Sequence, residues 1–258
     1  MANVQEIKIK SSVDGTTQPN IIITSSSYNI ENFVPLLVAL HTWQGDYKQL
    51  VKPIEKQIEK RNWVALLPNF RGPNCLENPD CKKACGSEYA QRDIVDAINY
   101  VFSCYKIDKQ RVYLIGGSGG GYMSLMMVAK YPNMWSAVST WASISDLKKW
   151  WEENKNYSIH IEACLGGPPG KSSEIDKEYY ERSPINFITS AKNVWLDIHH
   201  GINDMVVPYH HSEDVYKKLI DAGSKKARFT LFKGGHTINY FQACQWVSKK
   251  SNEIVVTT

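Results

Sequence analysis

The chain has 258 residues, of which 43% are hydrophobic and 22% are charged, as in an ordinary soluble globular protein. Its net charge is only +4, and its 30 Lys and Arg residues are spread along the chain, which argues against the basic patch of a nucleic-acid-binding protein. No segment approaches the ~20 consecutive apolar residues of a membrane-spanning helix, so a membrane protein is not expected either.

The N-terminal part of the chain predicts a strand pair followed by a buried strand. Two runs of alternating polarity, at 4–10 and 21–25, flank Asp14-Gly15, a dipeptide that is typical of a tight turn. The run Val34–His41 is continuously apolar until it ends at a polar residue. Such a run is expected of a strand that is buried on both faces of a parallel sheet.

From residue 47 onward, predicted helices alternate with predicted buried strands. In chain order these are a helix at 47–61, a strand at 63–68, a helix with Ser87 as its N-cap, a strand at 112–115, a helix at 121–130, strands at 137–142 and 194–200, a helix at 212–222 closed by Gly223, a strand at 227–232 and a helix at 239–247. The alternation indicates an α/β protein with a mostly parallel eight-stranded sheet and helices on both faces. No internal repeat or long linker interrupts the pattern, so residues 1–258 are interpreted as a single domain.

Residues 145–191 separate two predicted sheet strands and are too many for an ordinary connection. The segment contains several aromatic residues, among them Trp150, Trp151, Tyr157, Tyr179 and Tyr180. A connection of this length more often forms a cap or a substrate-binding segment than an idle loop. We therefore expect a cap, whose aromatic rings could offer flat surfaces to a ligand, although such rings more often pack together.

The six cysteines are too few for a disulfide scaffold, but Cys75, Cys81 and Cys85 fall in one predicted loop at 69–86. A local disulfide is plausible there if the protein lies outside the reducing cytosol, and no Cys or His pair at zinc-finger spacing completes a metal site. Cys104 falls in a helical pattern and is expected to be a small core residue. The first ten residues lack the apolar core of a secretory signal, which predicts a cytoplasmic protein or a secreted one that is already processed.

The stretch Gly116-Gly117-Ser118-Gly119-Gly120 lies between a predicted strand and a predicted helix and matches G-x-S-x-G, the nucleophile elbow. The turn in this motif is sharp, so flanking glycines let strand and helix approach closely and expose one hydroxyl. The helix N-terminus also directs its free amides toward Ser118. A phosphate-binding loop is the alternative, but the chain has neither G-x-G-x-x-G at its first βα turn nor the Lys-Ser/Thr of a P-loop. Ser118 is therefore the predicted nucleophile.

A serine hydroxyl needs an imidazole to take its proton and a carboxylate to orient that imidazole. In hydrolases with this motif the acid follows the serine in the chain, and the histidine comes last. Asp204 follows the fifth buried strand and His236 follows the last strand, so these two residues complete the predicted triad.

Other carboxylates and imidazoles are expected to have structural or surface roles. The alternatives to the triad residues are Asp197 inside a strand and Asp214 and Asp221 in a helix. His199, His200, His210 and His211 precede the last strand and are expected at the surface or in loops, and His41 ends a strand and is expected to shape the loop after it. The oxyanion of the reaction also needs two backbone donors. One is the amide of Gly119, after the nucleophile, and the other is expected in the loop after the strand at 34–41, with Trp43 preferred over Thr42.

Six motifs occur in an order and at separations that are found in a known family. They are PNFRGP at 68–73, DIVDAINYV at 93–101, IDKQRVYLIGGSGGGYMSLMMVAKYP at 107–132, SPINF at 183–187, HHGINDMVVPYHHS at 199–212 and FKGGH at 232–236. From about Val34 onward the chain thereby resembles the α/β-hydrolase fold and, within it, the catalytic domain of the prolyl oligopeptidase family and its stand-alone esterase relatives. The resemblance implies a serine hydrolase and is much less informative about the substrate.

Two positions depart from this resemblance. Relatives often carry His-Gly-Gly at the oxyanion strand, where this chain has His41-Thr42-Trp43, and they usually place a larger residue after the serine, where this chain has Gly119. Because the donors are backbone amides, an oxyanion hole is still expected. The β-propeller of full-length prolyl oligopeptidases is not expected, because only a short strand pair precedes the hydrolase domain.

The leading hypothesis is a serine hydrolase that cleaves carboxylic esters through an acyl-enzyme, with acetyl or feruloyl esters of plant polysaccharides as attractive substrates. The alternative is a small peptidase of the same family without a propeller, for which Arg71 is the candidate to hold a peptide terminus. A non-catalytic binding protein is a third interpretation, against which the ordered triad argues. The expected partner is a small-molecule or carbohydrate ester, with no cofactor, metal, nucleic acid or membrane, and the sequence predicts no oligomeric state.

Overall fold

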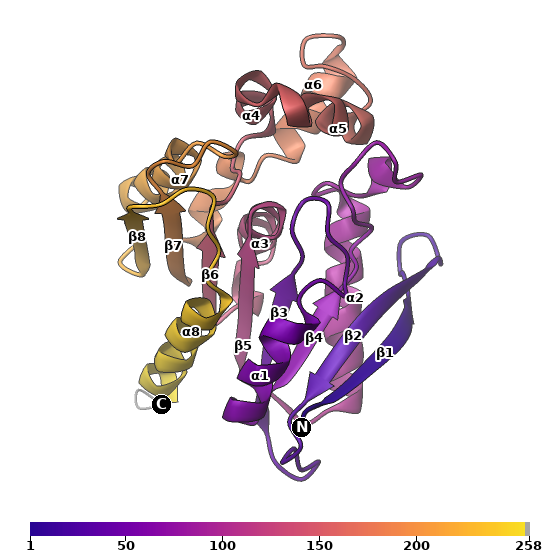
Figure 1. Cartoon of the computed structure of the whole chain (residues 1–258), viewed down its shortest axis with the longest axis vertical. Helices are drawn as coiled ribbons and strands as arrows, with labels where there is room; N and C mark the ends of the chain where they lie inside the picture. Colours follow the sequence, from indigo (N-terminus) through magenta and orange to yellow (C-terminus); the bar gives the residue numbers. More distant parts are fainter. Residues whose placement is uncertain (256–258) are drawn as a thin grey trace.

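The computed structural model describes residues 1–255 and the side chains of residues 1–250 (Figure 1). Its centre is one sheet of eight strands in the order β1-β2-β4-β3-β5-β6-β7-β8. The strands are β1 (Asn3–Lys10), β2 (Thr17–Thr24), β3 (Val34–Leu40), β4 (Val64–Pro68), β5 (Ile107–Gly117), β6 (Ala137–Trp141), β7 (Trp195–Gly201) and β8 (Ala227–Phe232). β2 pairs antiparallel with β1 and with β4, and the other neighbouring pairs are parallel. The carboxyl ends of β3 to β8 therefore meet at one edge of the sheet.

Helices cover both faces of the sheet (Figure 1). The helices α1 (Val51–Arg61) and α8 (Tyr240–Val255) pack on one face, and α2 (Glu88–Cys104), α3 (Gly119–Lys130) and α7 (His210–Asp221) pack on the other. β4 shows why, because Val64 and Leu66 belong to the core under α2 and α3, while Ala65 and Leu67 belong to the core under α1 and α8. A strand buried on both faces has the continuously apolar sequence from which it is predicted.

The α/β-hydrolase fold and the eight predicted strands are confirmed, with differences in element bounds. The helix predicted at 47–61 begins only at Val51, because the residues before it form a separate hydrogen-bonded turn. The strand predicted at 112–115 extends over Ile107–Gly117, because the buried Ile107 already pairs with Val34 of β3, and the register with β3 is irregular between this pair and the pair of Leu36 with Val112. Ser87 caps α2 as predicted. No helix within residues 1–255 is both long and apolar enough to cross a membrane.

Three short helices form a cap beyond the carboxyl edge of the sheet (Figure 1). They are α4 (Leu147–Glu153), α5 (Lys155–Leu165) and α6 (Ser173–Glu181). Their small core contains Trp150 and receives Trp43 from the loop after β3. The segment predicted as a cap at 145–191 is a cap only as far as α6, because residues 184–191 return to the sheet and pack Ile188 into the core beside α3.

The structure answers the open question about a disulfide and corrects the prediction for Cys104. All six cysteines lie in the described part of the chain and are free thiols, so the loop at 69–86 contains no disulfide. Cys81 and Cys85 contact the cap instead, where the Cys81 thiol donates to a backbone carbonyl of α5 and Cys85 is hydrogen-bonded to Cys164. Cys104 is exposed rather than part of the core, because it is the last residue of α2 and lies beyond the buried face of that helix.

Candidate active site

Ser118 lies in the sharp turn between β5 and α3, at the carboxyl edge of the sheet. Its backbone has φ 54° and ψ −122°, a conformation that is costly for a residue with a side chain. The Ser118 amide donates a hydrogen bond to the Trp141 carbonyl oxygen at 2.8 Å, which fixes the turn to β6. A Cβ at Gly116 would lie 2.2 Å from the Gly120 carbonyl oxygen, so only glycine lets the strand and helix meet this closely. The turn thus holds Ser118 directly before the first residue of α3.

Asp204, in the loop after β7, is held from several sides. Its Oδ1 accepts hydrogen bonds from the amides of Val206 and Val207 at 2.9 and 3.0 Å. Its Oδ2 lies 2.7 Å from His236 Nδ1 and 3.2 Å from His200 Nε2. Burial alone would raise the pKa of the Asp204 carboxyl, but the hydrogen bonds from both imidazoles and from the Val207 amide lower it well below its usual value. Asp204 is therefore ionised at neutral pH.

His236 lies in the loop after β8, and this loop reaches back toward Ser118. A Cβ at Gly117 would lie 2.5 Å from the Ile238 side chain, so Ile238 packs against the residue before Ser118. The His236 side chain is 23% exposed, whereas Asp204 beneath it is buried. Within the described residues no hydrogen bond joins Ser118 to His236, and catalytic contacts of this kind often tighten only when substrate is bound.

Three histidines near the acid loop are buried, which corrects the prediction that they lie on the surface. His199, His200 and His211 are each at most 1% exposed. His200 Nδ1 accepts a hydrogen bond from Ser212 Oγ at 2.6 Å, and its Nε2 donates to a backbone carbonyl at 2.8 Å. Because the same imidazole also contacts Asp204 Oδ2, His200 helps to hold the Asp204 carboxylate in position beside His236. The sequence offered one signal for this role, the place of His200 within a strand that is otherwise buried.

The backbone at Trp43 lies directly against the nucleophile turn. A Cβ at Gly119 would be 2.3 Å from the Trp43 backbone nitrogen. His41 holds this loop, because its two ring nitrogens lie 2.9 Å from the carbonyl oxygens of Thr42 and Asn69, in agreement with the loop-shaping role predicted for it. The close approach also explains why two departures from the family pattern occur together, since a loop that places Trp43 here requires glycine after the serine.

Replacing Gly119 by Ala is expected to lower kcat for ester hydrolysis about 10²- to 10³-fold, as the loss of one oxyanion donor does in other enzymes. The added methyl group would displace the Trp43 amide. Gly235→Ala is the matched control, because a Cβ there would meet nothing nearer than 3.6 Å. Steady-state kinetics of both variants, with circular dichroism as a check on folding, makes the comparison. A wild-type kcat in Gly119→Ala would show that the Trp43 amide is not a donor of the oxyanion hole.

The aromatic residues of the cap mostly pack inward rather than face a ligand. Trp150 is 1% exposed, and its ring meets that of Trp43 edge-on at a centroid distance of 4.8 Å. Trp150 Nε1 and Asn154 Nδ2 each donate a hydrogen bond to the Val206 carbonyl oxygen at 2.9 Å. α4 therefore contacts both the loop of Trp43 and the loop of Asp204, and Trp150 offers no flat surface to a substrate.

Arg71 is not available to hold a peptide terminus. Its guanidinium is 1% exposed and forms ion pairs with Asp93 of α2 and, at 2.9 Å, with Asp14 of the β1–β2 turn. These pairs join the loop after β4 to two other parts of the fold. The peptidase hypothesis thereby loses the residue that the sequence suggested for it.

The part of the chain with described side chains contains one group of three residues that could hold a metal ion, Glu153, His210 and His211. All three lie outside the predicted triad.

At one edge of the sheet the structure offers a serine, an imidazole and a carboxylate, with two backbone amides beside the serine.

Comparisons with known proteins show the family and the fold of this chain. Residues 59–253 match the sequence profile of the prolyl oligopeptidase family. The acylamino-acid-releasing enzyme of Rattus norvegicus is 24% identical over 196 residues, and the match covers 71% of this chain but only 26% of that enzyme. Feruloyl esterase B of Thermothelomyces thermophilus is 26% identical over 189 residues, which are 71% of this chain and 64% of that protein. A solved ferulic acid esterase superposes with a TM-score of 0.73 and 16% identity, covering 97% of this chain and 98% of its own.

Proposed function

The chain belongs to the prolyl oligopeptidase family, and we propose that it is a serine hydrolase that cleaves carboxylic esters through an acyl-enzyme. The observation that carries this proposal is the contact of Asp204 with His236, 2.7 Å apart, on loops that converge on the strained turn of Ser118. A hydroxyl, an imidazole and a carboxylate follow one another in the chain in the order that this fold uses for hydrolysis.

In the proposed reaction, His236 takes the proton of Ser118 while the hydroxyl oxygen attacks the carbonyl carbon of the ester. The amides of Trp43 and Gly119 donate hydrogen bonds to the oxyanion that forms. His236 then gives its proton to the leaving alcohol, and a water molecule hydrolyses the acyl-enzyme by the same sequence of steps. Asp204 remains ionised and keeps a proton on His236 Nδ1, so that Nε2 is free to act as the base.

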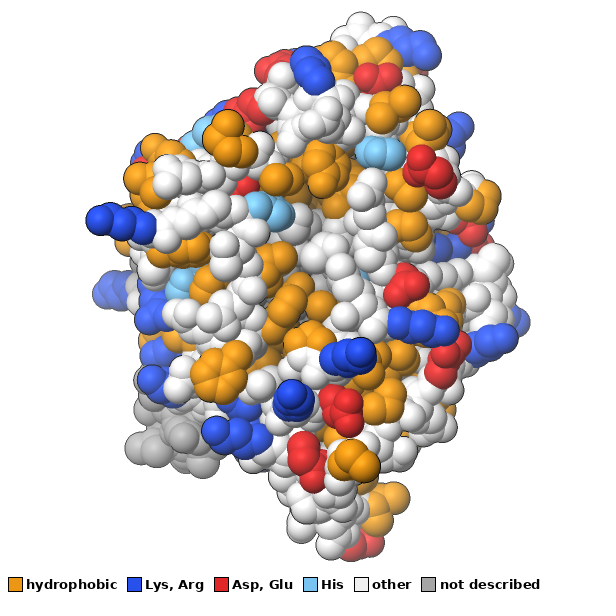
Figure 2. Space-filling model, viewed as in Figure 1, with side chains coloured by type: hydrophobic (Ala, Val, Ile, Leu, Met, Phe, Trp, Pro, Cys, Tyr) orange, Lys and Arg blue, Asp and Glu red, His pale blue; other side chains and the backbone are white. Residues whose placement is uncertain are grey.

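Two features favour an ester over a peptide as substrate. Arg71 is already paired with two carboxylates, so it cannot bind a peptide carboxylate without breaking buried ion pairs. Ile202 and Met205, on either side of Asp204, are exposed apolar side chains that could contact an aromatic acyl group. Figure 2 shows hydrophobic side chains gathered over the middle of the face that it draws, below the cap. Feruloyl esters of plant polysaccharides are the proposed substrates, and acetyl esters are the alternative.

A substrate panel tests this choice. The protein is expected to hydrolyse methyl ferulate and nitrophenyl acetate and butyrate with kcat/KM at least about 10²-fold above that for aminoacyl anilides. The highest value is expected for the feruloyl ester. Comparable rates on the anilides would favour the peptidase instead. A preference for the acetyl ester over the feruloyl ester would overturn the aromatic acyl group while leaving the esterase intact.

A further inference from the structure

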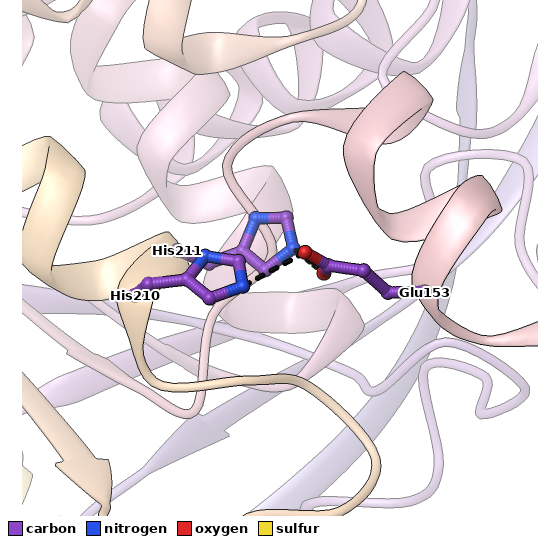
Figure 3. Close-up of side chains that lie close together, drawn as sticks. All are labelled: Glu153, His210 and His211. Atoms are coloured by element: carbon purple, nitrogen blue, oxygen red, sulfur yellow. Dashed lines mark hydrogen bonds and ion pairs between the residues drawn. The ribbon is translucent and has the colours of Figure 1, made fainter.

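Glu153, His210 and His211 converge where the cap meets the start of α7 (Figure 3). Glu153 is the last residue of α4, and the two histidines are the first residues of α7. The carboxylate lies between the two imidazoles, with Oε1 2.8 Å from His210 Nε2 and Oε2 3.1 Å from His211 Nε2. The proposed hydrolysis uses none of these side chains, so their convergence needs an explanation of its own.

The donor atoms of this group suit a transition-metal ion. One ligand atom of each residue lies within 4.8 Å of those of the other two. Two imidazole nitrogens and a carboxylate oxygen form a donor set that zinc binds in proteins, at distances of about 2.0–2.2 Å. The atoms around a tetrahedral ion with these bond lengths are about 3.3 Å apart. An ion can therefore be accommodated by small side-chain rotations, without a movement of either helix.

The surroundings of the group also fit a bound ion. His211 is fully buried, while the side chains of His210 and Glu153 are 30% and 26% exposed, so that an ion can enter from solvent and keep water as its fourth ligand. Ser145 Oγ lies 3.2 Å from His211 Nδ1 and can accept a hydrogen bond from it, as the outer partners of metal-bound imidazoles commonly do. The nearby Lys149 is paired with Asp214 at 3.0 Å, which offsets its charge.

Protons balance when an ion binds. Without an ion, each imidazole donates from Nε2 to Glu153, and the Ser145 amide, 3.3 Å from His211 Nδ1, fits this tautomer. With an ion, Nε2 coordinates through its lone pair and the proton moves to Nδ1, so a neutral imidazole releases no proton. The hydrogen bond from the Ser145 amide to His211 Nδ1 is then lost, and Nδ1 donates to Ser145 Oγ instead. The metal thus replaces the two hydrogen bonds to Glu153 by stronger bonds among the same residues.

We propose that Glu153, His210 and His211 form a zinc site that fastens the cap to α7. Asn154, the residue after Glu153, donates a hydrogen bond to the Val206 carbonyl in the acid loop, so the ion would stabilise the contact of α4 with this loop. The role is structural, and it does not depend on which substrate the protein hydrolyses. A pair of His–Glu hydrogen bonds without metal is the alternative.

Titration of the EDTA-treated and dialysed full chain with zinc, followed by calorimetry, tests the proposal. We expect one ion per chain, and we expect Glu153→Gln and His210→Gln each to weaken binding at least about tenfold. Glu152→Gln is the matched control, because it removes the neighbouring charge of α4 and leaves the three ligands. Zinc should raise Tm in the wild-type protein and in Glu152→Gln, and not in the other two variants.

Cobalt(II) distinguishes this site from the thiols of Cys81, Cys85 and Cys164, because thiolate ligands add a charge-transfer band in the near ultraviolet. The expected spectrum is that of a nitrogen and oxygen site without this band. Three results would overturn the proposal: no stoichiometric zinc binding, equal binding in Glu153→Gln and His210→Gln, or a thiolate band that Cys164→Ser abolishes. If Glu153→Gln does not fold, the zinc binding of His210→Gln tests the proposal. The His210 side chain is partly exposed, so its replacement disturbs packing less.

Discussion

Replacing Ser118 by Ala is expected to lower kcat for nitrophenyl esters by about 10⁴- to 10⁶-fold. Without the hydroxyl no acyl-enzyme forms, and only the oxyanion amides and substrate binding are left to promote attack by water. The variant should fold, because it loses a single oxygen and retains the Ser118 amide bond to Trp141. Labelling with a fluorophosphonate probe measures the same site independently, and the variant should remain unlabelled.

Ser143→Ala is the matched control for this experiment. Ser143 lies just after β6 at the same edge of the sheet, and among the described residues its buried Oγ has no hydrogen-bond partner. Removal of that hydroxyl should therefore leave both folding and kcat close to wild type. Equal labelling of wild type and Ser118→Ala would indicate another nucleophile. A wild-type chain that is never labelled would instead support a non-catalytic binding protein.

Replacing Asp204 by Asn is expected to lower kcat about 10⁴-fold in a protein that still folds. The amide would present an N–H group to His236 Nδ1 in place of an accepting oxygen. His236 would then carry its proton on Nε2, the nitrogen that must accept the proton of Ser118. The remaining amide oxygen can still accept the hydrogen bonds of Val206 and Val207, which hold the loop. Steady-state kinetics and the rate of fluorophosphonate labelling should fall together.

The control for this variant is Asp221→Asn, which removes the same charge from the exposed end of α7 and should leave kcat unchanged. A second measurement uses the stability of the protein against pH. The pKa of Asp204 is lowered by folding, so its contribution to stability is present above the unfolded value of about 3.9 and is lost as the pH falls through the folded value. Asp204→Asn should lack this acid-dependent loss. A variant with nearly wild-type kcat would show that another group orients His236.

Local signals in the sequence were enough to predict the sheet and the nucleophile turn. An apolar run such as 34–41 identifies a buried strand, because a parallel sheet covered on both faces has no position for polar side chains. G-x-S-x-G identifies Ser118 because five consecutive residues contain the steric requirements of the turn. The contact of Asp204 with His236 could be predicted because each residue follows its strand directly and the chain order of such triads is fixed within the fold.

Contacts between distant segments could not be predicted in this way. Arg71 seemed free in the sequence because its partners Asp93 and Asp14 lie 22 and 57 residues away. The contact of His200 with Asp204 could not be predicted, because nothing nearby in the chain indicates it. Trp150 seemed able to bind a ligand because the loop that buries it belongs to a different part of the chain. In each case the burial of a polar or aromatic residue depends on partners that only the folded chain brings together.

Trp43 connects the cap to the nucleophile turn. Its indole packs into the cap, and its backbone nitrogen lies against the turn of Ser118. A graft that exchanges residues 147–181 for the cap of a homologue would leave this indole without its pocket, even if the new helices folded well. The backbone amide of Trp43 would then no longer be held in position beside Ser118. Residue 43 and the turn glycine would have to be transplanted with the graft. A change of the cap that alters the substrate range is therefore expected to alter kcat as well, because both depend on Trp43.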